Sequence, residues 1–343
     1  MANIIKHIIL LISKYFGFFH LCKLLYKNRI RILCYHGFSI DNEEKFVPGL
    51  FIKPDIFDQR MKYLKDHNFN VISLEQAYQA VKLNDIAENS VVITIDDGFY
   101  STYKIGLPIL KKYDFPSTLY LTSYYFDKDC PIFGLATKYI FWNSAQTNAD
   151  FSTLDIPEMD SETSVILKST HAEKIQETII QIGQAYENDN QRIELLKKLA
   201  AILGQDYQAL NKSRILNLIN QQELDQCIKF GMDIELHTHR HKFPVEGDIA
   251  RYEIEKNKER INPLLPKPMS HFCYPSGDWS KEHWPILEQQ NIKTSTTCDN
   301  GLITIKTPFH AWSRYLDSAR MSQLEFEAEL SGFNEVLRKM SGQ

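Results

Sequence analysis

From Arg31 onward, short apolar segments alternate with amphipathic segments, and this alternation limits the possible folds more than any other feature. The apolar segments have the length and composition of buried strands, and the segments between them have helical periodicity. Such alternation is typical of repeated β-α units around a parallel sheet. The candidate strands are Ile32–Tyr35, Asn70–Ser73, Val91–Ile95, Ser117–Thr122, Met232–Leu236, Ser270–Tyr274 and Ile292–Thr297.

Amphipathic helices are expected between the early strands, at Pro54–His67, Leu74–Leu83 and Ile105–Tyr113. Seven strands with crossover helices predict an α/β fold over residues 31–335, a distorted (β/α) barrel of about seven parallel strands. An open, doubly wound sheet is the alternative.

One part of the chain breaks the alternation. Between Tyr125 and Asn220 no segment has a convincing strand pattern, whereas Ala172–Tyr186 and Gln191–Leu203 have helical ones. We therefore expect a helical insertion at about residues 130–220.

The composition is that of a globular protein, with 43% apolar and 24% charged residues in a chain of 343. A net charge of -4 argues against a nucleic-acid partner. Six scattered cysteines without a CxxC pair favour reduced, buried thiols and a cytoplasmic chain.

Residues 1–30 form a separate, strongly apolar N-terminal segment. A spanning helix needs about 20 nearly uninterrupted apolar residues, and polar residues interrupt this segment. On a helical wheel the polar residues gather on one side, and Leu10 is the one apolar residue that lies among them. The interrupting residues are Lys6, His7, Ser13, Lys14 and His20.

This pattern predicts an amphipathic helix that makes a peripheral membrane contact through residues 4–21. The location would then be cytoplasmic, on the inner face of the membrane. A basic run follows the helix and would assist the contact. Its members are Lys23, Lys27, Arg29 and Arg31. A helix packed on the domain and an uncleaved signal-anchor are the alternatives.

Reactive residues follow four of the candidate strands, where the loops of a parallel barrel share one face. The four segments are Asp96-Asp97-Gly98, His237–His241, Pro275-Ser276-Gly277 and His36-Gly37.

Asp96 and Asp97 can share a site only if the chain turns there, because adjacent strand residues point to opposite faces. Gly98 permits such a turn. Two close carboxylates raise one pKa unless a cation neutralises them, so the pair indicates a metal. The alternative is that these aspartates cap a helix N-terminus.

His237 and His241 are four residues apart, so a helical turn or a bent loop would bring them together. Two imidazoles and one carboxylate make a divalent-metal site with an open position for water. The alternative is a histidine-rich surface loop.

A metal in such a site acidifies water and polarises a carbonyl, and the remaining carboxylate would act as general base. Backbone N–H groups near Ser276 would stabilise the oxyanion. The residues alone leave open which aspartate is the base.

The motifs resemble those of the polysaccharide deacetylase family, a group of carbohydrate esterases. Thr94–Gly98 is similar to the family's Thr-Phe-Asp-Asp-Gly, and His237-Thr238-x-x-His241 to its His-Ser/Thr-x-x-His. Cys34–His36 resembles its opening Thr-Tyr-His, and Phe272–Gly277 its third motif. The resemblance covers about residues 31–125 and 221–335.

The resemblance implies a metal-dependent hydrolase of amide C–N bonds with Zn²⁺ or a similar divalent ion. It implies that Asp96 is the general base and that Asp97, His237 and His241 bind the metal. The expected substrate and partner is an acetylated glycan, with N-acetylated sugars in a polysaccharide or its lipid-linked precursor.

Two departures from the family pattern concern the catalytic partners. Cys273 stands near the place where many members carry an arginine, and Arg314 could match the arginine that orients the base. The final histidine motif is not evident, and His310 is the candidate general acid after residue 300. A catalytically impaired glycan-binding relative and a non-haem iron oxygenase are the alternatives.

Overall fold

All seven predicted strands pair in parallel in the computed structural model, which describes residues 2–154 and 164–340. The sheet order is β11-β10-β9-β6-β5-β1-β12, and β4 pairs with β5 outside this path. The strands are β1 Arg31–Tyr35, β4 Asn70–Val71, β5 Ser90–Asp97, β6 Ser117–Leu121, β9 Met232–Leu236, β10 His271–Cys273, β11 Thr294–Thr296 and β12 Tyr315–Leu316.

The two edges of this sheet are linked near β11 and β12. Thr296 forms a parallel bridge with Trp312. The Trp312 N–H donates to the Ser295 carbonyl at 3.0 Å, and the Thr297 N–H donates to the Trp312 carbonyl at 2.9 Å. The seven strands of the path therefore curl into a distorted barrel, as the sequence predicts, and the open doubly wound sheet is excluded.

The central strands are covered on both faces. Every residue of β1 and β6 is buried, and β5 is buried up to Asp97. Apolar side chains on both faces are typical of parallel sheets, because crossover helices cover them. The two-residue strands that were not predicted include β12 and the separate parallel pair of β2 Gly37–Phe38 with β3 Phe51–Ile52.

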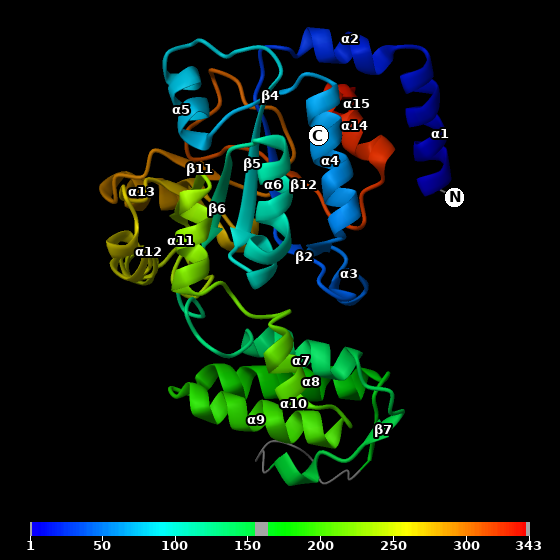
Figure 1. The fold of residues 1–343 in the computed structure, drawn as a ribbon, viewed down its shortest axis with the longest axis vertical. Coiled ribbons are helices and arrows are strands. Elements are labelled where there is room, and N and C mark those ends of the chain that lie inside the picture. The colour runs from blue at the N-terminus through cyan, green and yellow to red at the C-terminus, as the bar shows by residue number, and fades with distance from the viewer. Residues whose placement is uncertain (1, 155–163, 341–343) are drawn as a thin grey trace. The chain divides into compact units, whose positions relative to one another are not determined.

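Helices surround these strands in the first of two compact units, which consists of Met1–Phe126 and Gln221–Gln343 (Figure 1). A π-helical turn at Thr102–Gly106 precedes α6 and overlaps only the start of the third predicted helix, Ile105–Tyr113. The α-helices of this unit after residue 30 are α3 Glu43–Phe46, α4 Pro54–Asp66, α5 Leu74–Lys82, α6 Leu107–Tyr113, α11 Gln221–Lys229, α12 Gly247–Ile261, α13 Trp284–Gln289, α14 Gln323–Ser331 and α15 Phe333–Met340.

The N-terminal segment is two helices, which corrects the prediction of one. α1 Ala2–Tyr15 and α2 Phe18–Leu25 meet at a bend of 76°. Gly17 has a φ of 78°, a left-handed conformation that glycine adopts without steric cost, and it stands directly before the second helix as its N-cap. Among the described residues no single helix has the length and apolar composition to cross a membrane, whereas this bent pair taken together passes on both counts.

The second unit, Asp127–Asn220, occupies the part of the chain where the sequence predicts a helical insertion. Within it α7 packs on α8 and α9. A two-residue antiparallel pair, β7 with β8, is the exception to its helical character. Its elements are α7 Phe133–Trp142, β7 Asn148–Ala149, β8 Val165–Ile166, α8 Thr170–Ala185, α9 Asp189–Ile202 and α10 Tyr207–Ser213.

Candidate functional site

The two aspartates occupy the last two positions of β5, and both pair with β6. Asp97 has a φ of 72° and Gly98 a φ of 93°. The chain therefore leaves the extended conformation at Asp97, one residue before the turn expected at Gly98. As a result the carboxylates have different neighbours, Arg314 for Asp96 and two histidines for Asp97.

His237 and His241 converge on Asp97 from the loop after β9. Their Nε2 atoms lie 3.3 Å and 3.4 Å from Asp97 Oδ1. Thr238 and His241 have φ values of 64° and 56°. A bent loop, and not a helical turn, therefore brings the two imidazoles together.

A hydrogen bond fixes the ring of His237. Its Nδ1 lies 3.0 Å from the Cys273 carbonyl oxygen. Because a carbonyl only accepts hydrogen bonds, Nδ1 carries a proton, and Nε2 is the ring nitrogen that faces Asp97. This is the second partner that metal-binding histidines usually have, and it sets both tautomer and ring orientation.

These three residues fit a divalent metal. Their ligand atoms all lie within 4.8 Å of one another. Burial raises the pKa of Asp97, but the His237 hydrogen bond and the neighbouring histidines lower it to about 2, so the carboxylate is ionised at neutral pH. The Asp97 side chain is 14% exposed and that of His241 is 40% exposed, so the cluster is open to solvent.

Asp96 and Arg314 form a buried, bidentate ion pair. Arg314 Nη1 donates to Asp96 Oδ1 at 2.7 Å, and Nη2 donates to Oδ2 at 2.8 Å. Burial alone would raise the pKa of Asp96, but the guanidinium outweighs it and holds the pKa well below its usual range.

Arg314 is itself held in place from several sides. Nε donates to the Thr297 carbonyl at 2.9 Å, and Nη1 lies 3.2 Å from Thr94 Oγ1. Nη2 lies 3.1 Å from Cys273 Sγ. The structure thus brings Arg314 to Asp96. The same guanidinium also contacts Cys273, which stands near the place where many family members carry an arginine.

Two other groups of possible metal ligands include Asp96, one with Cys34 and His36 and one with His237 and Cys273. In both, the carboxylate oxygens of Asp96 already accept hydrogen bonds from Arg314. The Asp97 group has no such competing cation among the described residues, and we therefore take it as the candidate metal centre.

His310 and Ser276 are not brought to this centre by any described contact. His310 is 7% exposed, and its Nδ1 lies 3.0 Å from Ser295 Oγ. No hydrogen bond or ion pair within 2–154 and 164–340 joins it to Asp96 or Asp97. Ser276 is exposed with a φ of 57°, and the Gly277 N–H beside it donates to the Tyr274 carbonyl.

His36 lies at the site, although the sequence interpretation gave it no role. It directly follows β1, and its Nε2 is 3.8 Å from Asp96 Oδ2. Its side chain is 18% exposed. The signal for it was present, because it follows a predicted strand of the same parallel sheet, as Asp97 and His237 do.

Comparison with protein families matches residues 151–295 to the polysaccharide deacetylase family. This range contains His237, His241 and Phe272–Gly277, whereas Asp96 and Asp97 lie outside it. It begins within the helical segment that we expected to lie outside the resemblance.

A curated relative is YxkH of Bacillus subtilis (strain 168), whose assignment as a polysaccharide deacetylase is itself inferred. The two chains are 29% identical over 94 residues, which is 27% of this chain and 32% of YxkH. The chain thus matches about a third of the length of that relative.

Solved structures of deacetylases share the fold over most of both chains. PplD of Streptococcus pyogenes, solved with acetate, has a TM-score of 0.56 at 20% identity and covers 88% of this chain and 98% of its own. A de-N-acetylase from Aggregatibacter actinomycetemcomitans has a TM-score of 0.55 at 13% identity, and the match covers 88% of this chain and 99% of that one. IcaB from Ammonifex degensii has a TM-score of 0.54 at 14% identity, and the match covers 88% of this chain and 97% of that one. These solved structures share the fold, and the family match makes the chain similar to the polysaccharide deacetylase family over residues 151–295.

Proposed function

We propose that this chain is a metal-dependent hydrolase that removes acetyl groups from N-acetylated sugars of a polysaccharide or its lipid-linked precursor. The observation that carries the proposal is the convergence of His237 and His241 on Asp97, beside the buried Asp96–Arg314 pair. The similarity to a de-N-acetylase and to a deacetylase solved with acetate supports acetyl as the group removed.

Asp97, His237 and His241 would hold the metal, and we favour Zn²⁺ because imidazole nitrogen and carboxylate oxygen are among its usual ligands. When bound, such an ion polarises the amide carbonyl and lowers the pKa of water at the site. The protein contributes an ionised Asp97 and a His237 whose Nε2 faces that carboxylate.

Asp96 is the general base in this proposal. It takes a proton from water as the water oxygen bonds to the acetyl carbon. Arg314 is a positioning residue: its two hydrogen bonds fix the carboxylate, and its charge keeps Asp96 ionised despite burial.

The C–N bond then breaks, acetate forms, and the leaving sugar amine requires a proton. We assign that proton transfer to His36, because it lies beside Asp96 and remains partly exposed, whereas His310 contacts Ser295. Stabilisation of the oxyanion by a backbone N–H at Ser276 stays part of the proposal.

The test combines metal content with acetate release from oligomers of N-acetylglucosamine. Asp97→Asn and His237→Gln should each lose bound metal and at least about a hundredfold in activity, the scale on which such groups act. His239→Gln is the matched control, because His239 Nδ1 lies 2.9 Å from Ser123 Oγ and the residue belongs to no metal-ligating group among the described residues.

Full activity in either ligand variant would refute the metal assignment. A folded, metal-loaded protein that releases no acetate from any acetylated glycan, yet binds one, would instead favour the non-catalytic glycan-binding relative.

A further inference from the structure

The first two helices turn their apolar side chains towards solvent. Twelve large apolar side chains of this segment are at least 46% exposed. On monomeric proteins, exposed apolar residues rarely gather in this way without a binding role. We call these residues the apolar face: Ile4, Ile5, Ile8, Ile9, Leu11, Ile12, Tyr15, Phe16, Phe18, Leu21, Leu24 and Leu25.

The polar side of α1 is turned inward onto α14. Lys6 Nζ lies 2.7 Å from Glu325 Oε1, and Lys14 forms an ion pair with Glu327. Leu10, the apolar exception on this side, is fully buried. It packs in a cluster with Phe19, Cys22, Leu324, Ala328 and Phe333.

This docking reverses the usual amphipathic arrangement, in which the apolar side of a surface helix faces the core. We propose that the apolar face is a membrane-contact surface, with α1 and α2 lying in the boundary between lipid headgroups and acyl chains. α14 holds both helices so that this face points outward.

The width of the apolar face favours lipid over a partner helix. At 100° per residue the apolar residues of α1 cover about 160° of its circumference. A coiled-coil seam is a narrower stripe, and one straight partner helix could not follow a bend of 76°. A bilayer surface can contact a wide apolar face on both sides of a bend. α1 alone is about 21 Å long, too short to cross a hydrocarbon core of about 30 Å.

The charges around the face agree with anionic lipid. No acidic residue occurs in the sequence before Asp41. Arg29 is the cation best placed for a lipid phosphate, because its guanidinium forms no ion pair or hydrogen bond with the residues that the structure describes. Arg31, also expected at the interface, is buried and donates to the Leu330 carbonyl. Lys27 pairs with Glu88.

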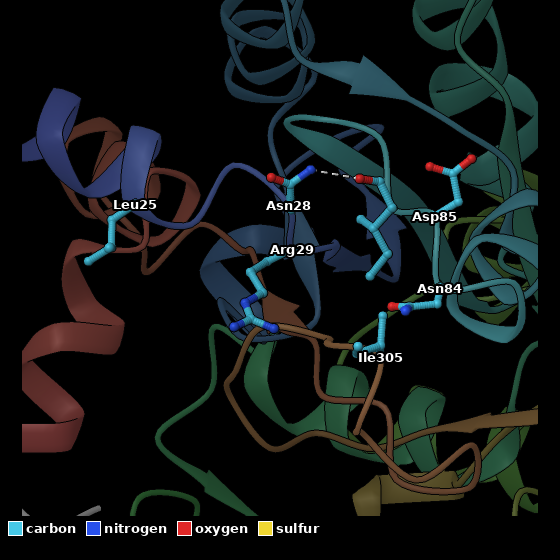
Figure 2. Close-up of a pocket in the computed structure, with 7 residues that line it drawn as sticks. Leu25, Asn28, Arg29, Asn84, Asp85 and Ile305 are labelled. Atoms are coloured by element: carbon cyan, nitrogen blue, oxygen red, sulfur yellow. Dashed lines mark hydrogen bonds between the residues drawn. The ribbon is translucent and has the colours of Figure 1, made fainter.

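Figure 2 shows Leu25, at which the apolar face stops, and Arg29 among the residues that line one cavity. Both residues line a cavity of about 360 Å³. Its other lining residues are Asn28, Asn84, Asp85, Ile86 and Ile305. A phosphate could therefore reach Arg29 while the apolar side chains stay in the acyl layer.

Vesicle sedimentation of the full chain tests the proposal, with phosphatidylcholine alone and mixed with phosphatidylglycerol. The wild type should bind both, more tightly to the mixture, and retain binding at high salt because apolar burial dominates. Ile8→Gln/Ile12→Gln, at positions 49% and 52% exposed, should lower the lipid partition coefficient at least about tenfold. Arg29→Gln should reduce only the preference for phosphatidylglycerol.

The matched control is Ile166→Gln/Ile249→Gln, at positions 63% and 51% exposed outside the apolar face, which should bind vesicles like the wild type. Acetate release from a soluble substrate should be unchanged in all variants, so failure of this proposal stays separate from failure of the proposed function.

Three results would overturn the membrane contact. One is equal binding by the wild type and Ile8→Gln/Ile12→Gln. Another is a lipid-free wild-type dimer that this variant converts to monomer without vesicle binding, since a second copy would then cover the face. The third is a protein isolated from its own cells without residues 1–25.

Discussion

At the scale of single residues, Asp96 and Arg314 show how a buried charge is kept ionised. The carboxylate is 2% exposed and the guanidinium is fully buried. Because the folded pKa of Asp96 is below its unfolded value, the pair stabilises the fold above about pH 4, and this contribution is lost as the pH falls further. At neutral pH the pair therefore serves both stability and the proposed base.

Arg314→Met tests this dependence. Without the guanidinium, burial raises the pKa of Asp96, so the acid limb of the activity profile should move to higher pH. At neutral pH the unpaired carboxylate should lower the free energy of unfolding by about 3–5 kcal/mol. Urea unfolding and a pH–rate profile measure the two effects.

The double variant Asp96→Asn/Arg314→Met separates the effect on stability from the effect on activity. It removes both charges, so it should recover part of the lost stability, whereas activity should be lost with the proposed base. An unchanged acid limb in Arg314→Met would contradict the assignment of Asp96 as base.

At the scale of elements, the site depends on short segments that leave regular structure in the left-handed region. Asp97, Thr238 and His241 all have positive φ without being glycine. Such conformations cost about 1–3 kcal/mol each and persist where surrounding packing fixes them. Here they lie at the end of β5 and in the loop after β9, the strands that deliver the three candidate ligands.

Gly98→Ala tests the turn after β5. Gly98 has a φ of 93°, and a Cβ there would lie 2.2 Å from Leu121 Cδ1, so the turn should shift and carry Asp97 with it. We expect a weaker metal affinity, by about tenfold or more, and a lower free energy of unfolding. Metal titration and urea unfolding measure both.

Gly231→Ala is the control for strain alone. Gly231 has a φ of 85°, but a Cβ would meet nothing within 4 Å. It should lose about 1 kcal/mol of stability with unchanged metal affinity. Equal metal affinity in the two variants would show that the turn at Gly98 does not position Asp97.

At the scale of the whole molecule, a bound metal should stabilise the fold, because its candidate ligands come from two separate strands and their loops. A ligand that binds only the folded state at a hundred times its Kd contributes about 2.7 kcal/mol. Addition of Zn²⁺ should therefore raise the Tm of the wild type, and a chelator should reverse the rise. Asp97→Asn should show no rise. An equal rise in that variant would place the ion elsewhere.

Much of the fold could be predicted because strand and helix patterns are local. All seven predicted strands are present, and the predicted helices at 54–67 and 74–83 agree with α4 and α5 to within a residue. Ser73 also caps α5 through a reciprocal pair of hydrogen bonds with Gln76. β2, β3 and β12 have two residues each, too few for a periodic pattern, and were missed. The bend at Gly17 was missed because apolar residues continue on both sides of it.

The sequence by itself determined which residues stand at strand ends, since strand, turn and reactive residue are neighbours along the chain. Asp97 ends a strand of the parallel sheet, and His237 and His36 directly follow two others. Only the tertiary structure decided which partners they have. Arg314 reaches Asp96 across 218 positions of sequence, and Lys6 reaches Glu325 across 319. Pairings over such separations depend on how the barrel curls and where its last helices pack, and no local pattern encodes either.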